Sequence, residues 1–159
     1  MFPSHLAERS KTLELAGVPT LLAHPDWQKP APVMFWMHGR TVTKELDPGR
    51  YLRWIRAGIA AVSVDLPGHG QRTGPKLHGP DTTPGVLEQM VGEIDGVLDA
   101  IRQSEFGDLF DLSRIGIGGM SAGGMVTLRR LCDEHPFVCA AVESTTGWLG
   151  ELYDPEETR

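Results

Sequence analysis

Hydrophobic residues along the chain fall into short runs that predict buried strands. Residues 33–38 (VMFWMH) and 59–65 (IAAVSVD) are largely apolar and lie between Pro or Gly residues, which is typical of strands buried on both faces. Residues 114–119 (RIGIGG) predict a third buried strand, and residues 137–143 (FVCAAVE) predict a fourth strand. Earlier in the chain, 11–23 holds two short apolar runs around an Ala-Gly turn, and this pattern predicts an N-terminal β-hairpin.

Helical signals separate these runs. Residues 47–57 start with Asp-Pro-Gly, which supplies an N-cap and a first-turn proline, and Gly58 is a natural helix end. A longer helix is predicted from Thr83, because its apolar positions recur at intervals of three and four residues. These positions are Leu87, Met90, Val91, Ile94, Val97, Leu98 and Ile101. A third helix is predicted over 121–135, before Pro136.

The alternation of strands and helices predicts an α/β fold in which right-handed βαβ units build a mostly parallel sheet. The 159 residues and the hydrophobic content of 40% suit a single globular domain, 1–159, without an internal repeat. The last residues, 150–159 (GELYDPEETR), are acidic and have no periodic pattern. We expect residues 144–159 to be a disordered tail or the start of a lid or insertion over the site.

Charge and composition exclude several classes of function. The formal net charge of −6 gives no electrostatic support for nonspecific binding to nucleic acid or to an anionic membrane surface. No apolar run approaches the roughly 20 residues that span a bilayer, and residues 1–11 do not have the pattern of a signal peptide. Because the chain contains neither CxxC nor HExxH, we expect no metal and no other cofactor.

The two cysteines favour a reducing compartment. Cys132 and Cys139 lie among apolar residues, which predicts small thiols in the core rather than a disulfide or a redox pair. A reducing compartment is where such thiols persist, so we expect the protein to be cytoplasmic.

The sequence Gly119-Met120-Ser121-Ala122-Gly123 matches the G-x-S-x-G motif of serine hydrolases. The motif follows a predicted buried strand and opens a predicted helix, which is the context that it requires. A sharp strand-to-helix turn strains the backbone at the serine, so the positions two before and two after must be small. The turn lifts the serine oxygen above the sheet, with the helix N-terminus behind it to stabilise negative charge.

Two more turns agree with this interpretation. His38-Gly39-Arg40 follows the first central strand, and Asp65-Leu66-Pro67-Gly68-His69-Gly70 follows the second. Together the three motifs resemble those of the α/β-hydrolase superfamily, over roughly residues 12–145. Among its subfamilies the chain looks most like small esterases of the dienelactone-hydrolase, acetyl-xylan-esterase and prolyl-oligopeptidase-like group. The resemblance implies an α/β-hydrolase fold, with helices on both faces of a mostly parallel sheet.

The resemblance also assigns roles to residues. Ser121 corresponds to the nucleophile, and the backbone N–H groups of Ala122 and Arg40 correspond to the two donors of the oxyanion hole. The implied activity is that of a serine esterase, which cleaves a small-molecule carboxylic ester through an acyl-enzyme. For the Arg40 side chain two interpretations stay open, a solvated loop residue and a contact to substrate.

The chain lacks an obvious general base. Of its six histidines only His135 follows Ser121, whereas in this fold the triad histidine follows the nucleophile. The predicted helix would place His135 about 21 Å from the serine, far beyond the roughly 3 Å that proton transfer requires. We therefore expect His135 to be a structural helix-end residue. His38 and His69 follow strands at the serine's end of the sheet and are less favoured substitute bases.

The sequence also offers no obvious acid for the triad. Glu143 ends the strand after the nucleophile strand, so it is a possible acid. Other candidates for the acid after the serine are Glu151, Asp154, Glu156 and Glu157. In the resembling family the acid more often follows the next strand, and the last two strands of the family's sheet have no counterpart here. Residues 137–143 would then form an open edge, which invites aggregation.

Two hypotheses account for the incomplete sheet. The 159 residues could be part of a longer hydrolase whose triad acid and histidine lie beyond residue 159, or a second polypeptide could complete the sheet. In either case we expect the 159 residues alone to be inactive.

Two other functional classes compete with the esterase. A nucleotide-binding domain would use the glycine-rich stretch 115–124 as a phosphate loop, but Ser121 stands where G-x-G-x-x-G requires its third glycine. Met125 also stands where a P-loop requires lysine. A non-catalytic binding or scaffold protein would explain the missing histidine. It leaves unexplained why a strained serine with flanking glycines is kept.

Overall fold

The computed structural model describes residues 3–72 and 74–150. One six-stranded sheet has the order β1-β2-β4-β3-β5-β6. The strands are β1 (Ser10–Leu15), β2 (Val18–Ala23), β3 (Ala31–Met37), β4 (Ala60–Val64), β5 (Phe110–Met120) and β6 (Cys139–Glu143). The helices are α1 (Ser4–Ala7), α2 (Pro48–Arg56), α3 (Thr83–Gln103) and α4 (Ala122–Arg130), with 3₁₀ turns η1 (Pro80–Thr82) and η2 (Gly107–Leu109).

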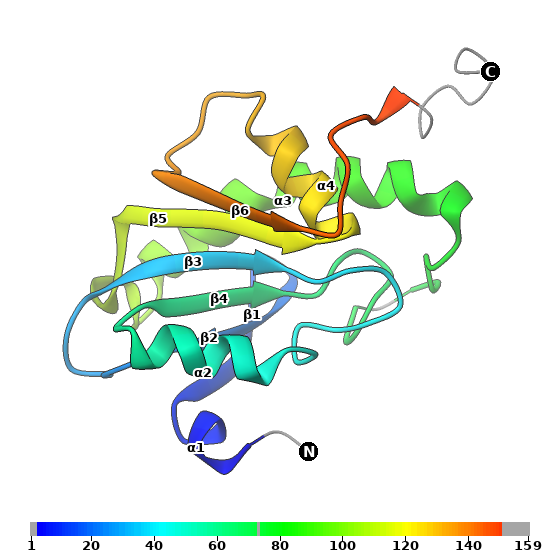
Figure 1. Ribbon diagram of the computed structural model, residues 1–159. Coiled ribbons are helices and arrows are strands. Elements are labelled where there is room, and N and C mark those ends of the chain that lie inside the picture. Colours follow the sequence, from blue (N-terminus) through cyan, green and yellow to red (C-terminus); the bar gives the residue numbers. More distant parts are fainter. Residues whose placement is uncertain (1–2, 73, 151–159) are drawn as a thin grey trace.

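The sheet is mostly parallel, as the sequence predicts. β1 and β2 form the antiparallel hairpin, and β2 runs antiparallel to β4. The pairs β3–β4, β3–β5 and β5–β6 are parallel. The carboxyl ends of β3, β5 and β6 therefore point to one end of the sheet (Figure 1). Loops that follow these strands meet there, which is where α/β folds commonly place their sites.

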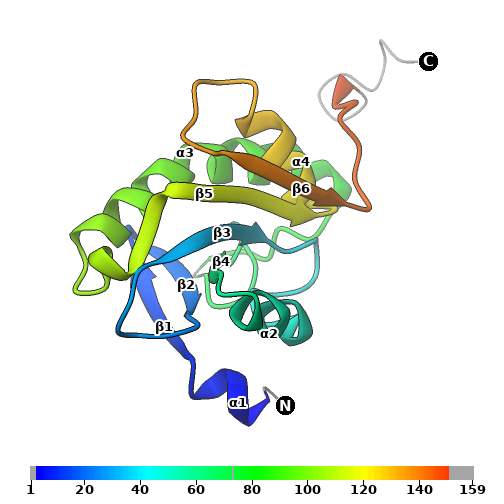
Figure 2. The same cartoon turned by 60° about the vertical axis from the view of Figure 1, so that its left-hand side comes forward.

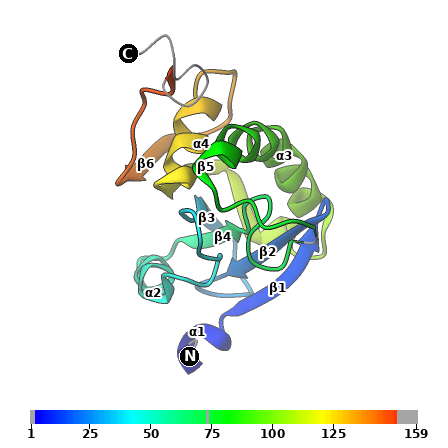
Figure 3. The same ribbon diagram turned by 90° about the vertical axis from the view of Figure 1, so that its right-hand side faces the viewer.

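Helices cover both faces of the sheet. Figures 2 and 3 show α1 and α2 on one face, and α3 and α4 on the other. The predicted stripe of α3 is buried at every position except Val91, which is partly exposed. The shorter helix α2 begins and ends as predicted, because Asp47 Oδ1 accepts the Arg50 N–H at 3.1 Å and Gly58 has a φ of +78°. No helix among the described residues is long and apolar enough to cross a bilayer.

The third predicted helix is shorter than expected. α4 ends at Arg130, and the turns that follow carry the chain to the far end of β5, where Val138 N–H donates to Ile115 O at 2.9 Å. His135 is therefore not a helix-end residue; it lies exposed in this connection, stacked on Phe137 with ring centroids 5.7 Å apart. The paired stretch of β5 separates it from Ser121 by about 20 Å, at roughly 3.3 Å per residue.

The predicted burial of the two cysteines in the core is wrong. Cys132 and Cys139 are both exposed free thiols. Cys132 lies beyond the end of α4. Cys139 opens β6, which is exposed along its whole length and, among the described residues, pairs with β5 alone. Apolar neighbours in the sequence do not bury a side chain when its strand lies at the edge of the described sheet.

Candidate active site

Ser121 stands between β5 and α4 in a conformation that residues with a side chain rarely adopt. Its φ is +52° and its ψ is −116°. A non-glycine residue in such a region carries strain of order 1–3 kcal/mol. Helix α4 begins at the next residue, Ala122, so the partial positive charge of the helix N-terminus lies beside the serine.

Close packing excludes a side chain at the two glycines that flank the serine. A Cβ on Gly119 would overlap the backbone of Gly123, and a Cβ on Gly123 would overlap the carbonyl groups of Met37 and His38. Gly123 N–H also donates to His38 O at 3.1 Å. The turn around the serine is thus packed directly against the end of β3.

The chain after β6 holds the serine from its other side. Ser121 N–H donates to Glu143 O at 2.9 Å, and Thr145 Oγ1 donates to Ser121 O at 2.9 Å. Thr145 also fills the space beside Gly124, where a Cβ would lie 2.8 Å from the threonine side chain. Because both polar backbone groups of Ser121 are bonded, its neighbours maintain the strained conformation.

His38 is a neutral structural residue that joins three segments. Its Nδ1–H donates to Gly39 O at 2.6 Å, and its Nε2 accepts the Leu66 N–H at 3.0 Å. Its carbonyl oxygen accepts the N–H of Gly123 in α4. Burial lowers the pKa of His38 to about 4, and the hydrogen bond to Gly39 O and the charge of Asp65 offset only part of that effect. With both ring nitrogens bonded, His38 has no free position for the serine's proton.

His69 lies next to His38, with ring centroids 5.4 Å apart. Its Nδ1–H donates to Pro67 O at 2.8 Å, and burial lowers its pKa, so it is also neutral near pH 7. Its Nε2 is buried without a hydrogen-bond partner among the described residues. Within the same residues, neither histidine forms a hydrogen bond to Ser121.

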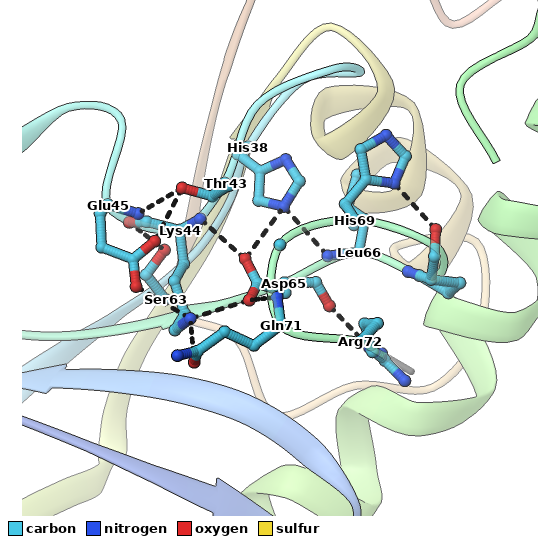
Figure 4. Close-up of polar contacts among 12 residues, drawn as sticks. His38, Thr43, Lys44, Glu45, Ser63, Asp65, Leu66, His69, Gln71 and Arg72 are labelled. Atoms are coloured by element: carbon cyan, nitrogen blue, oxygen red, sulfur yellow. Dashed lines mark hydrogen bonds and ion pairs between the residues drawn. The ribbon is translucent and has the colours of Figure 1, made fainter. Parts of the chain in front are cut away.

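A buried ion pair joins the loop after β3 to the loop after β4 (Figure 4). Lys44 Nζ lies 2.8 Å from Asp65 Oδ2, and both side chains are fully buried. The backbone N–H groups of Lys44 and Gln71 donate to the same carboxylate at 3.0 and 2.9 Å. Burial alone would raise the pKa of Asp65, but these donors outweigh it and hold the pKa below its usual value. The pair fixes the loop that carries Arg40.

The predicted oxyanion donors lie together beside the serine. Arg40, Ser121 and Ala122 line one cavity of about 100 Å³, whose other walls are Pro80, Thr83 and Met125. Gly39 is wedged against the serine, because a Cβ there would lie 3.3 Å from Ser121 Cβ.

No described group accepts a hydrogen bond from the N–H of Arg40 or Ala122. The Arg40 side chain is exposed. A larger open groove, of about 580 Å³, lies at α1 and β1, and none of the predicted site residues lines it.

Glu143 contacts the serine only through its backbone. Its carboxylate receives two hydrogen bonds of 2.8 Å from the Arg50 guanidinium, which also lies over the Trp36 ring at 4.1 Å. The hydrogen bond from Arg50 lowers the pKa of Glu143. The side chain therefore points to the α2 face of the sheet and is bonded there.

The sequence missed the residues that support and enclose the site. No motif marks Lys44, and the sequence identifies Thr83 only as the start of a helix. Thr145 lies in the range 144–159, for which the sequence predicts a lid or a tail, and residues 151–159 of that range lie outside the described part of the chain. Only the tertiary structure gives these residues their roles, because Thr83 lines the cavity, Thr145 bonds Ser121 and Lys44 pairs with Asp65.

No protein-family model and no curated protein matches the sequence. Many solved structures match the fold. TT1662 from Thermus thermophilus is 22% identical with a TM-score of 0.71, and the match covers 87% of this chain and 57% of that one. Esterase Pf2001 of Pyrococcus furiosus is 16% identical with a TM-score of 0.71, and the match covers 95% of this chain and 57% of that one.

A cold-adapted esterase from an Arctic intertidal metagenomic library is 24% identical with a TM-score of 0.65, and the match covers 84% of this chain and 58% of that one. The chain therefore spans about half the length of the solved structures that it matches. At these identities the likeness concerns the fold.

Proposed function

We propose that this chain, which has the α/β-hydrolase fold, carries the acyl-transfer half of a serine esterase. Ser121 is the proposed nucleophile. The observation that carries the proposal is the cavity in which a strained serine meets two free backbone donors, Arg40 N–H and Ala122 N–H. Several structural neighbours are named as esterases, which supports hydrolysis of a small carboxylic ester.

The proposed mechanism follows from these positions. Ser121 Oγ attacks the ester carbonyl carbon, and the two amides hold the oxyanion of the tetrahedral intermediate. The serine's proton passes to a histidine oriented by an acid, and both lie outside the described residues, beyond residue 159 or on a second chain. That histidine then protonates the leaving alcohol, and water releases the acyl group from Ser121.

The glycine-rich turn supports this function over nucleotide binding. In a phosphate loop the glycines leave room for the ligand to approach the backbone. Here the protein's own backbone occupies the space beside each glycine: that of Gly123 lies beside Gly119, and the end of β3 lies beside Gly123.

The location in the cytoplasm remains a prediction from the sequence.

Labelling with a fluorophosphonate tests the nucleophile. The full-length protein is expected to form an adduct that peptide mapping places on Ser121, and Ser121→Ala is expected to lose at least a thousandfold in labelling rate. Ser113→Ala is the matched control, because Ser113 is an exposed serine on the same strand β5. Equal labelling of the wild type and Ser121→Ala would refute the assignment. Absence of labelling in a folded wild type would favour a non-catalytic binding protein.

A further inference from the structure

Hydrogen bonds within the protein hold one wall of the cavity beside Ser121 in place. Thr83 is buried, and its Oγ1 donates to Gly79 O at 3.2 Å. Thr82 Oγ1 donates to the same carbonyl at 2.8 Å. These bonds tie the turn that carries Pro80 to the start of α3. The wall is therefore a folded turn rather than a single exposed side chain.

Met125 forms another part of the cavity wall. Its N–H donates to Ser121 O at 3.0 Å, so its position is coupled to that of the serine. Its side chain is partly buried and packs against the main hydrophobic core. Apart from Arg40, the lining residues carry no charge.

The volume of the cavity limits what can lie beside the oxyanion donors. At about 100 Å³ it is well below the 300–1,000 Å³ of pockets that hold drug-sized ligands. An apolar cavity of about 150 Å³ holds benzene, which has six non-hydrogen atoms, so a cavity of about 100 Å³ has room for roughly four. An acetyl group has three non-hydrogen atoms, and a propanoyl group has four.

We propose that this cavity binds the acyl group of the substrate and restricts it to two or three carbons, with Met125 and Thr83 as the limiting walls. The proposal rests on the function proposed above. A carbonyl oxygen held between Arg40 N–H and Ala122 N–H places the acyl substituent against these walls. An alcohol portion would leave the cavity through its open side, so the proposal constrains the acyl group alone.

Hydrolysis of p-nitrophenyl acetate, butanoate and octanoate by the full-length protein tests this. In the wild type, kcat/KM is expected to fall at least tenfold from acetate to butanoate, and further for octanoate. Met125→Ala is expected to raise the butanoate-to-acetate ratio of kcat/KM about tenfold, because it opens the wall. Met125→Leu conserves volume and should keep the wild-type ratio.

Met34→Ala is the matched control, since Met34 is a partly buried methionine on β3 that does not line the cavity. A thermal melt confirms that each variant is folded. A wild type that hydrolyses octanoate as efficiently as acetate would overturn the acyl-size proposal, and so would an unchanged ratio in folded Met125→Ala; both leave the esterase proposal intact. A wild type that hydrolyses none of the three esters would overturn both proposals.

Discussion

The two sides of Ser121 differ in how completely they are built. On the side of β3, buried groups hold the loop that carries Arg40: the neutral ring of His38 and the Lys44–Asp65 pair. Gly123 of α4 also packs directly against the end of β3. On the side of β6, the strand is exposed at every position, and Val138, Val142 and Trp148 are large exposed apolar residues. Among the described residues, the carboxylate at this side is that of Glu143, and it is bonded to Arg50.

This difference separates the two tasks of a serine hydrolase. The β3 side has the rigid, bonded character needed to hold an oxyanion, because pre-organised donors act without rearrangement. The β6 side would face the histidine and the acid, and among the described residues it offers neither as a free group next to the serine. Under the proposed function, the described residues thus specify how an acyl group would be held more fully than how a proton would be moved.

The largest expected effect comes from breaking the buried ion pair on the β3 side. Lys44→Met leaves the Asp65 carboxylate buried without its cation, which should lower the free energy of unfolding by about 3–5 kcal/mol in urea titrations. Val142→Ala on the exposed β6 side should change it by no more than about 0.5 kcal/mol. Similar effects of the two substitutions would contradict the contrast between the two sides.

A smaller effect should appear as a dependence on pH. Folded His38 takes up a proton only near pH 4, whereas the unfolded side chain does so near 6.5. Its contribution to stability is therefore complete above pH 6.5 and is lost as the pH falls toward 4, by up to about 3 kcal/mol. Unfolding of the wild type and of His38→Gln, compared between pH 7 and pH 4, measures this.

The variant should show a shallower loss of stability than the wild type. His69, whose pKa burial also lowers, is present in both proteins, so the difference reports on His38. Parallel pH profiles for the two proteins would mean that His38 is not buried as a neutral ring.

The smallest effect is expected at the β6 side. Glu143→Gln removes the charge of a half-exposed partner of Arg50, so the free energy of unfolding should fall by about 1 kcal/mol or less. Because Arg50 occupies the carboxylate, labelling of Ser121 by a fluorophosphonate should proceed at the wild-type rate. Strongly slowed labelling in a protein of unchanged stability would instead support Glu143 as the acid.

The local elements could be predicted from the sequence because each depends on neighbouring residues. The hairpin, the buried strands and the stripe of α3 follow from the spacing of apolar side chains, and the limits of α2 follow from Asp47 and Gly58. The same local logic failed for α4, since Pro136 marks the latest possible helix end and not the actual one. It also failed for Cys139, because burial depends on what lies beside a strand.

The sequence by itself determined the strand–turn–helix around Ser121, since glycines at 119 and 123 are a local requirement of that turn. Only the tertiary structure decided what surrounds it. A lysine in a loop is ordinarily solvated, yet Lys44 is buried because Asp65, which is 21 residues away, supplies a fully buried carboxylate. Thr83 and Met125 become walls of one cavity only when α3 and α4 pack on the same face of the sheet. Such contacts join residues that are distant in the chain, and no spacing of residue types encodes them.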